Sequence, residues 1–309
     1  MIEATKNLES EYGIKITFSI ENEPLGTAGP LILARKLLLE DDKPFFMLNS
    51  DVSCEFPLQE MIKYHKRHGR EGTILVTPVE NPSKYGLVVF KEDGQISEFL
   101  EKPQHETKEL PSNHINAGIY LLNKSVLDML PENPTNVSIE RQIFPQMTVK
   151  NNLYAMPLQG YWMDIGQPAD YLTGTKLHLK ALWGENPELF ATSESIKGKV
   201  TGNVLIHPTA KVGQNCHLGP DVVIGPNCVV GDGVRLTHTT LMEGTVVESF
   251  AYVANSIIGW RSKIRSWAHL KDCLLGEDVE ADNGIVLIGA TVCPHRGVKE
   301  SSLVPKVIL

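Results

Sequence analysis

Two aspartates, Asp51 and Asp164, each follow a short apolar segment and could together hold a metal ion against phosphates. Asp51 lies in "FFMLNSDV" (residues 45–52), and Asp164 ends "YWMD" (161–164). Carboxylates that are distant in sequence can meet at one edge of an α/β sheet, where ligands bind beyond the carboxyl ends of the strands. Mg²⁺ is typically held by one or two carboxylates and by substrate phosphates. Taken alone, however, the pair is better explained as two unconnected turn aspartates.

A glycine-containing turn at residues 21–30, "ENEPLGTAGP", follows an expected strand and opens an expected helix. Gly26 and Gly29 allow the backbone to approach a ligand closely, and a helix N-terminus favours anions or polar ring edges. A plain strand-to-helix turn explains the same residues at least as well.

Polar residues near further expected strand ends have the groups that a sugar phosphate needs. In "FLEKP" (99–103), the Glu101 carboxylate can accept hydrogen bonds from sugar hydroxyls, and the Lys102 ammonium can neutralise a phosphate. Asn116 in "NAGIY" offers both a donor and an acceptor to a polyol. An exposed ion pair and a structural turn are the competing interpretations. The histidines add no site, since His65 and His68 are expected on a solvated helix end.

Alternating strand and helix patterns in the first half indicate an α/β sheet that would position these residues. Strand patterns lie at 14–20, 45–48, 72–79 and 116–123, and helical patterns lie at 29–38 and 57–65. Asp93-Gly94 suits the turn of a hairpin. We therefore expect a mostly parallel sheet with an antiparallel addition, in which the strand at 45–48 is buried on both faces.

A period of six residues replaces this pattern after about residue 200. The aliphatic residues Ile206, Val212, Leu218, Ile224, Val230 and Leu236 recur every six positions, and glycine follows four of them. This period fits neither an α-helix nor a hairpin array. It is the hexapeptide signature of a β-helix, in which stacked coils bury one side chain per edge. The pattern slips around Met242 and resumes at Ile258.

The composition restricts the class of protein further. The 309 residues carry 29 basic and 37 acidic side chains, for a net charge of −8, and they contain no basic block. This argues against a nucleic-acid scaffold. Because no apolar run reaches the length of a membrane span and no signal peptide is recognisable, we expect no membrane association. Five cysteines without CxxC spacing favour a reduced, cytoplasmic protein.

The order of the motifs along the chain is more specific than any one of them. "EPLGTAGPL", "LNSDV", "PSKYGLVV", "FLEKP", "NAGIYLL", "YWMDIGQPADYL" and the hexapeptide repeats follow one another as in sugar-1-phosphate nucleotidyltransferases. More narrowly, the chain resembles the catalytic β subunits of eukaryotic GDP-mannose pyrophosphorylases over essentially its whole length. The resemblance implies an α/β, Rossmann-like nucleotidyltransferase domain at 1–175, a linker helix and loop at 176–200, and a left-handed hexapeptide-repeat β-helix at 201–309.

The resemblance also implies a reaction. A guanylyl group would pass from GTP to mannose 1-phosphate, which gives GDP-mannose and pyrophosphate. Asp51 and Asp164 would hold Mg²⁺, and Lys102 would meet the phosphate of the sugar. These three residues are the catalytic set that the resemblance implies.

The same resemblance implies the substrate contacts and the partners. Gly26 and Thr27 would lie along the guanine, and the mannose would be lined by Tyr85, Gly86, Glu101 and Asn116. The β-helix would mediate a homo-oligomer, a complex with a regulatory α-type subunit, or both.

One part of the family's pattern is absent from the printed sequence. The family opens with a strand and a glycine-rich loop of the type GxGTRLxPxT, followed by a PKP segment, and these grip the triphosphate. Met1 falls inside what resembles the family's second helix. The nucleotidyltransferase domain is therefore expected to be truncated at its N-terminus, and these 309 residues alone are expected to make little or no GDP-mannose.

Two other functions stay open at this point. A non-catalytic regulatory subunit would bind GDP-mannose tightly without turnover, although the retained motifs resemble the catalytic type. A hexapeptide acyltransferase would bind acyl-CoA between coils and use a histidine of the β-helix as its base. The α/β half of the chain argues against this second alternative.

Overall fold

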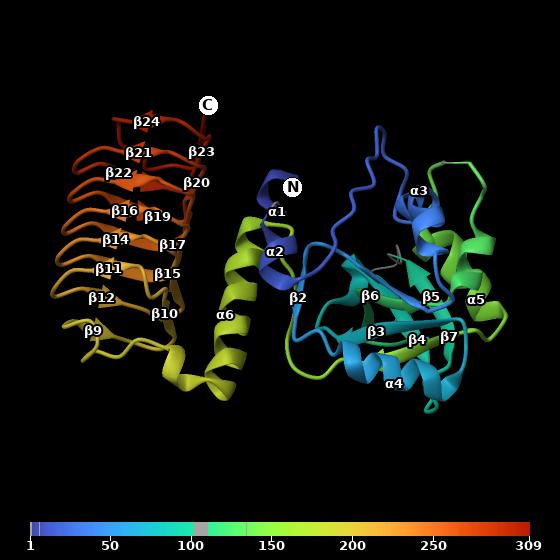
Figure 1. The fold of residues 1–309 in the computed structure, drawn as a ribbon. Coiled ribbons are helices and arrows are strands. Elements are labelled where there is room, and N and C mark those ends of the chain that lie inside the picture. The colour runs from blue at the N-terminus through green and yellow to red at the C-terminus, as the bar shows by residue number, and fades with distance from the viewer. Residues whose placement is uncertain (1, 6, 102–110, 134) are drawn as a thin grey trace. The chain divides into compact units, whose positions relative to one another are not determined.

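The structure, a computed structural model, describes residues 2–5, 7–101, 111–133 and 135–309. The chain forms two compact units (Figure 1). Unit 1 comprises Met1–Ser50 and Phe56–Gln159, and unit 2 comprises Asp51–Glu55 and Gly160–Leu309. The short segment 51–55 thus packs with the second half of the chain. This division describes packing, and the expected domain boundary at residue 175 stays a prediction.

A mixed sheet forms the centre of unit 1. Its strand order is β5 (Ile96–Glu101), β4 (Gly86–Phe90), β6 (His114–Leu122), β3 (Gly72–Pro78) and β7 (Leu153–Pro157), and β1 (Phe45–Leu48) also pairs with β6. Within this sheet, β6 runs antiparallel to β1, β3 and β4, and among its described strands only β3 and β7 pair in parallel. The expectation of a mostly parallel sheet is therefore wrong, because a buried apolar run looks the same in either orientation.

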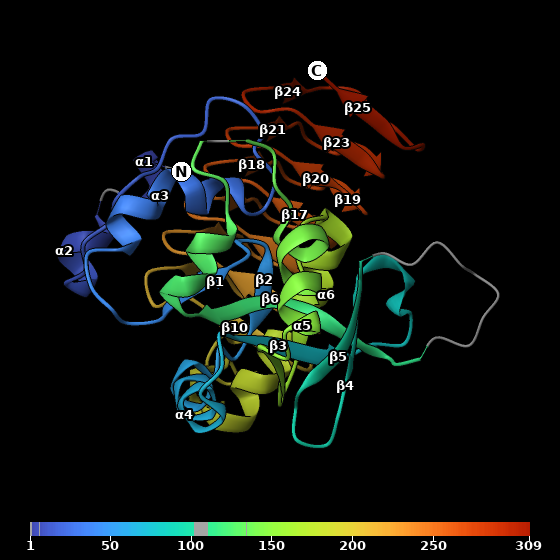
Figure 2. The same ribbon diagram turned by 90° about the vertical axis from the view of Figure 1, so that its right-hand side faces the viewer.

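The expected hairpin around Asp93-Gly94 is present, and Figure 2 shows it as the pair β4 and β5. Two other expected strands differ from the structure. β1 is only partly buried, because among the described strands it pairs with β6 alone. Residues 14–20 form no strand within the described chain, and Ile14 and Ile20 are exposed. Alternating apolar residues favour an extended backbone, but a strand also needs a neighbour that completes its hydrogen bonds.

Two helices of unit 1, α3 (Gly29–Leu38) and α4 (Leu58–His68), lie at the positions that the sequence predicts, 29–38 and 57–65. The other helices of this unit are α1 (Ile2–Thr5), α2 (Leu8–Tyr12) and α5 (Phe144–Val149), with short 3₁₀ segments η1 (Pro82–Lys84) and η2 (Lys124–Met129) and a π-helical segment η3 (Ile139–Ile143). The α3 side chains Leu31 and Ile32 join a core that also contains the fully buried Tyr120 and Phe144. This core connects α3 to the segment around residue 140.

His65 and His68 lie in a buried hydrogen-bond network rather than on a solvated helix end. His65 Nδ1 and His68 Nε2 both lie 2.8 Å from Thr73 Oγ1, and His65 Nε2 lies 3.1 Å from Asn123 Oδ1. The Arg70 N–H donates to His68 Nδ1 at 3.0 Å. The Arg70 N–H makes His68 Nδ1 an acceptor, so His68 carries its proton on Nε2 and donates it to Thr73 Oγ1. Thr73 then donates its own proton to His65 Nδ1, and His65 Nε2 donates to Asn123 Oδ1. Both histidines are therefore neutral and carry the proton on Nε2.

This network makes unit 1 sensitive to acid. Burial first, and then the repulsion that a protonated His68 would meet from a protonated His65 and from Arg70, lower the pKa of His68 to about 4, and burial lowers the pKa of His65. The unfolded chain, with pKa values near 6.5, takes up these protons first, so the free energy of unfolding falls as the pH drops from about 6.5 towards 4. We expect His68→Gln to flatten this dependence in urea titrations at several pH values. His217→Gln, at an exposed position, is the control, and an unchanged slope for His68→Gln would contradict the assignment.

Unit 2 joins a short strand pair and a long helix to a parallel β-solenoid. β2 (Val52–Cys54) pairs antiparallel with β8 (Trp162–Asp164), and α6 (Pro168–Glu185) packs on both the pair and the solenoid. The short 3₁₀ segment η4 (Pro187–Leu189) follows. The solenoid strands are β9 (Lys199–Val200), β10 (Val204–Ile206), β11 (Lys211–Val212), β12 (His217–Leu218), β13 (Val222–Ile224), β14 (Val229–Val230), β15 (Arg235–Leu241), β16 (Val246–Val247), β17 (Tyr252–Ile258), β18 (Lys263–Ile264), β19 (His269–Lys271), β20 (Leu274–Leu275), β21 (Glu280–Ala281), β22 (Val286–Ile288), β23 (Ala290–Val292), β24 (Gly297–Val298) and β25 (Lys306–Ile308).

The hexapeptide pattern of the sequence corresponds to the inward side chains of the solenoid. Leu218, Ile224, Val230 and Leu236 are at most 2% exposed, and the strands of successive coils pair in parallel. The expected β-helix is therefore confirmed. None of the helices in the described part of the chain combines the length and apolar character that crossing a lipid bilayer requires.

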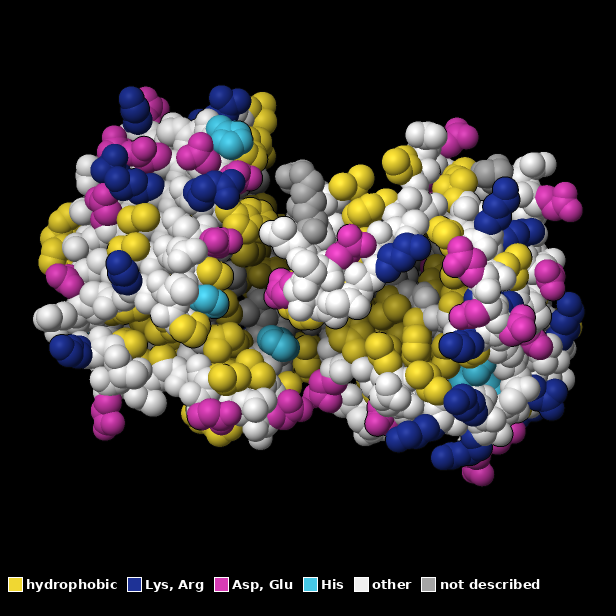
Figure 3. All heavy atoms as spheres, viewed as in Figure 1, with side chains coloured by type: hydrophobic (Ala, Val, Ile, Leu, Met, Phe, Trp, Pro, Cys, Tyr) yellow, Lys and Arg dark blue, Asp and Glu magenta, His cyan; other side chains and the backbone are white. Residues whose placement is uncertain are grey.

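The slip of the period around Met242 reflects a shorter coil. Val212 pairs with Val230, one coil of 18 residues, whereas Val230 pairs with Val247 and Val247 with Ile264, coils of 17 residues. The inward side chains of successive coils stay aligned, although these later coils have 17 residues instead of 18. Figure 3 shows charged side chains of both signs on the outer surface, where ion pairs such as Arg265 with Glu280 (2.6 Å) join successive coils.

The adjacent residues Val229 and Val230 provide a matched test of this core. Val230 is 2% exposed and Val229 is 41% exposed on the same strand. Val230→Ala removes two buried methyl groups and leaves a small cavity, so we expect it to lower the free energy of unfolding by about 2 kcal/mol. Val229→Ala should change it by less than about 0.5 kcal/mol in the same denaturant titration. Equal effects of the two substitutions would contradict the inward assignment.

Candidate active site

The strand pair of unit 2 brings Asp51 and Asp164 together. Val52 lies opposite Asp164, and the Ile165 N–H donates to the Asp51 carbonyl oxygen at 2.7 Å. A Cβ placed on Gly166 would lie 3.1 Å from Asp164 Oδ1 and 3.4 Å from Asp51 Oδ2. Both carboxylates therefore converge on the space beside Gly166.

This pair of carboxylates has the chemistry of a magnesium site. Asp51 is exposed and Asp164 is half-buried, and the Gly166 N–H donates to Asp164 Oδ1 at 3.0 Å. Among the residues that the structure describes, no third histidine, cysteine or acidic side chain joins the pair. Mg²⁺ commonly takes one or two carboxylates and completes its octahedron with water and substrate phosphates. The residues present therefore fit this ion.

A bulge in β6 of unit 1 determines the surroundings of Asn116. Ile74 of β3 pairs with Tyr120 and Val76 pairs with Asn116, so β6 uses four residues where β3 uses two. Gly118 in the bulge has a φ of +76°, which glycine adopts without strain. Asn116 and Tyr120 would be about 13 Å apart on a regular strand. The bulge instead allows Asn116 Nδ2 to donate to the Tyr120 hydroxyl at 2.7 Å.

Asn116 is thereby oriented for a polar ligand. Its Oδ1 accepts a hydrogen bond from the Gly118 N–H at 3.0 Å, so the positions of the amide oxygen and nitrogen are fixed. One N–H of the amide remains for a ligand, and the side chain is half-buried. Asn116 can therefore donate a hydrogen bond to a sugar hydroxyl.

Gly86 and Glu101 lie beside each other next to Asn116. The two residues pair between β4 and β5, and a Cβ on Gly86 would lie 2.7 Å from Glu101 Oε2. The pairing of Leu87 with Ile115 places Gly86 beside Asn116 on the neighbouring strand. The Glu101 carboxylate thus lies over a glycine backbone where a hydroxyl-rich ligand can approach it.

Tyr85 and Lys102 complete the list of predicted residues in this part of the chain. Tyr85 ends η1, its side chain is half-buried, and its N–H donates to the Pro82 carbonyl oxygen at 3.1 Å. Lys102 lies outside the described residues.

The turn that contains Gly26 and Thr27 is held by the segment at 137–139. The Ala28 N–H donates to the Val137 carbonyl oxygen, and the Val137 N–H donates to the Leu25 carbonyl oxygen, both at 2.9 Å. Gly26 has a φ of +73°, and a Cβ there would lie 2.6 Å from the Val137 carbonyl oxygen. Only glycine therefore fits this position without a shift of the backbone.

Two functional candidates were not recognised in the sequence. Glu140 is a buried carboxylate that accepts a hydrogen bond from Thr27 Oγ1 at 2.5 Å. Tyr120 is fully buried, and burial and the nearby Glu140 charge raise the pKa of its hydroxyl far above the usual range. Glu140 lies between the apolar residues of "VSIERQIF" but next to Arg141 and Gln142, so the sequence gives no clear signal that it is buried. Tyr120 is indistinguishable in the sequence from an ordinary core residue of its strand.

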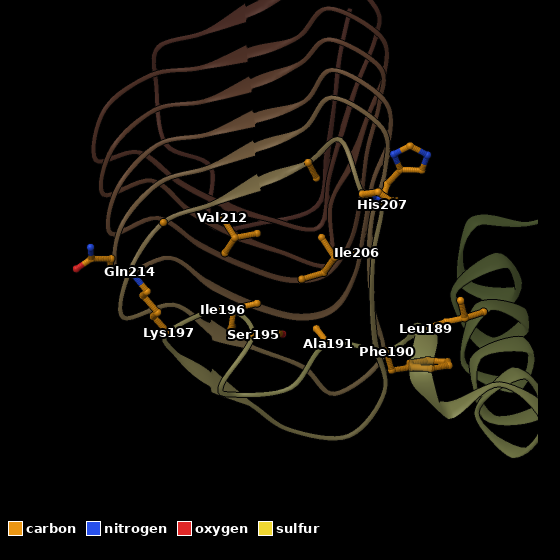
Figure 4. A pocket seen from close by; sticks show the side chains of 13 residues that line it. Leu189, Phe190, Ala191, Ser195, Ile196, Lys197, Ile206, His207, Val212 and Gln214 are labelled. Carbon is orange, nitrogen blue, oxygen red and sulfur yellow. The ribbon is translucent and has the colours of Figure 1, made fainter.

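A cavity of about 530 Å³ at the first coils of the solenoid has different chemistry. Figure 4 shows that Ile206 and Val212 point into the coil, whereas His207 points out of it. His207 Nδ1 lies 2.9 Å from Thr209 Oγ1. The arrangement gives no support to a histidine base for acyl transfer at this cavity.

The mixed sheet, the converging aspartates and the solenoid together define a sugar-nucleotide type of nucleotidyl transferase. Residues 1–181 match the nucleotidyl transferase family model, and residues 200–308 match the model described as the GMPPB C-terminal domain. The chain therefore belongs to the nucleotidyl transferase family and, within it, to the mannose-1-phosphate guanylyltransferases of the GDP-mannose pyrophosphorylase β type.

The narrower assignment rests on full-length relatives. The chain is 49% identical to the mannose-1-phosphate guanyltransferase of Schizosaccharomyces pombe, over 100% of this chain and 84% of the relative. It is also 49% identical to the mannose-1-phosphate guanylyltransferase catalytic subunit beta of Xenopus tropicalis, over 98% and 82%. A probable mannose-1-phosphate guanylyltransferase 3 of Oryza sativa is 48% identical, over 100% and 84%.

Gly26 allows a test of the turn with a matched control. Gly26→Ala meets the Val137 carbonyl oxygen and also forces alanine into a left-handed backbone. Gly69→Ala has a similar φ, +62°, but its Cβ would meet nothing within 4 Å. We expect Gly69→Ala to lower only stability, by about 1 kcal/mol, and Gly26→Ala also to weaken GDP-mannose binding at least tenfold. Isothermal titration and thermal unfolding measure the two effects, and equal nucleotide affinities would contradict the role of the turn.

Proposed function

We propose that this protein transfers a guanylyl group from GTP to mannose 1-phosphate and releases pyrophosphate. Its relatives carry the name of this activity. The observation that carries the proposal is the convergence of the Asp51 and Asp164 carboxylates beside Gly166. Phosphoryl transfer of this kind needs no covalent nucleophile from the protein, but it needs alignment of two anions and neutralisation of their charge.

The proposed mechanism assigns each part of the site to one of these needs. A phosphate oxygen of the sugar attacks the α-phosphorus of GTP, and the bond from this phosphorus to the pyrophosphate oxygen breaks. Asp51 and Asp164 would hold Mg²⁺, which when bound neutralises phosphate charge. Lys102 would neutralise the sugar phosphate.

The remaining residues would orient the two substrates. Glu101 would accept hydrogen bonds from mannose hydroxyls, and Asn116 would donate one, beside the backbone of Tyr85 and Gly86. The Thr27 hydroxyl is engaged with Glu140, so the turn would meet the guanine through the exposed backbone of Gly26 and Thr27 rather than through that hydroxyl.

Conservative replacement of the aspartates tests the mechanism. Asp51→Asn and Asp164→Asn keep the shape of the side chains but remove the charges, so each should lower the rate of GDP-mannose formation by about 100-fold or more. Asp170→Asn, in the first turn of α6, is the matched control and should change it less than about twofold. Pyrophosphate release from GTP and mannose 1-phosphate provides the measurement.

Full activity of both aspartate variants would overturn the proposed role of the pair. Tight GDP-mannose binding without turnover in the wild-type protein would favour a regulatory subunit instead.

We also propose that the solenoid mediates assembly, as a homo-oligomer or with a regulatory α-type subunit. Phe250 and Trp267 stack at 4.6 Å on one corner of successive coils, and they are 51% and 66% exposed. Exposed aromatic side chains of this kind are enriched at protein interfaces. A reducing, cytoplasmic location is in keeping with the five cysteines, which form no disulfide among the described residues.

A further inference from the structure

Glu140 is a charged residue inside unit 1 that the proposed chemistry does not use. Its side chain is 7% exposed, and it begins the π-helical segment η3 together with Ile139. A buried carboxylate is costly unless its oxygens accept hydrogen bonds. Here Oε2 accepts from Thr27 Oγ1 at 2.5 Å and from Ser138 Oγ at 2.9 Å. The carboxylate therefore has a fixed place beside the turn.

The direction of the hydrogen bond between Thr27 and Glu140 is determined by a third group. The Ile139 N–H donates to Thr27 Oγ1 at 3.0 Å, so this oxygen already acts as an acceptor there. Thr27 must then direct its single hydroxyl proton to Glu140. The donor proton of this hydroxyl is therefore used within the protein, although Thr27 as a residue is exposed.

The buried hydroxyl of Tyr120 also interacts with Glu140. Burial first, and the Glu140 charge second, raise the pKa of Tyr120. Tyr120 in turn accepts the hydrogen bond from Asn116 at 2.7 Å. A carboxylate that is constrained by Ser138 and Tyr120 can hold Thr27 in one position more rigidly than a mobile surface carboxylate could.

We propose that Glu140 is a positioning residue that fixes the Gly26–Thr27 turn for the nucleotide, and this inference rests on the proposed function. The backbone pairs Ala28–Val137 and Val137–Leu25 bring the turn near the 137–140 segment. The Thr27–Glu140 hydrogen bond then adds a contact between two side chains that fixes the turn from within the core. Nucleotide affinity should therefore depend on a residue that does not itself contact the nucleotide.

A double-mutant cycle tests whether Thr27 and Glu140 act together. Thr27→Val and Glu140→Gln should each weaken GDP binding by about tenfold, and the double variant should be no weaker than the weaker-binding single variant. Thr27→Ser keeps the hydroxyl and should bind GDP like the wild type. Thr148→Val and Glu98→Gln repeat the same chemical changes elsewhere in unit 1 and serve as controls. Isothermal titration with GDP, and separately with mannose 1-phosphate, measures these affinities, and the affinity for mannose 1-phosphate should change much less.

Amide hydrogen exchange of the unliganded chain gives a second readout that needs no activity. Thr27→Val and Glu140→Gln should accelerate exchange at the Ala28 and Val137 amides by about tenfold, whereas Thr27→Ser should not. Additive losses in the cycle, or unchanged exchange at both amides, would overturn the inference. If the wild type binds no GDP while exchange responds as expected, the proposed function fails but the positioning of the turn by Glu140 is retained.

Discussion

The antiparallel pairing of Val52 with Asp164 is the constraint on which the candidate site depends. It places two carboxylates at one point beside Gly166, where like charges repel each other. In a solvent-exposed position this repulsion is of the order of 1 kcal/mol at 4 Å. The backbone hydrogen bonds of the pair and the packing of α6 therefore hold a local arrangement that electrostatics opposes. A divalent cation between the carboxylates would replace this repulsion with attraction. The arrangement therefore favours an ion at that point.

Unit 1 uses a carboxylate in the opposite way. Glu140 is buried, and its negative charge is stabilised by hydroxyl donors of the protein rather than by an ion. The partly exposed pair in unit 2 can be reached by a ligand, whereas Glu140 is buried and interacts with Thr27, Ser138 and Tyr120. The same functional group is thus partly open to solvent in one unit and buried among hydroxyl donors in the other, and burial decides what it can bind.

The sequence predicted the solenoid better than it predicted the contacts around the candidate residues. Six aliphatic residues from Ile206 to Leu236 determine the coils, because each must point inward. The orientation of the strands was missed, since apolar runs such as 45–48 do not encode direction. The contact of Thr27 with Glu140 depends on backbone hydrogen bonds between two distant segments, and the contact of Asn116 with Tyr120 depends on a bulge in β6. Neither leaves a periodic signal, so local patterns could not reveal them.

The coil lengths of the solenoid show which part of its sequence is constrained. Inward positions must align from coil to coil because they form the core, whereas a corner can lose a residue if its backbone closes the turn. The left-handed corners are formed by Asn215 and Asn227 in the first coils but by Phe250 and Trp267 later, where such bulky residues are rarely found. The backbone at these later corners is therefore strained, and the side chains that it holds are exposed and stacked on each other. A core requirement does not explain these aromatic residues, but an external contact of the solenoid would.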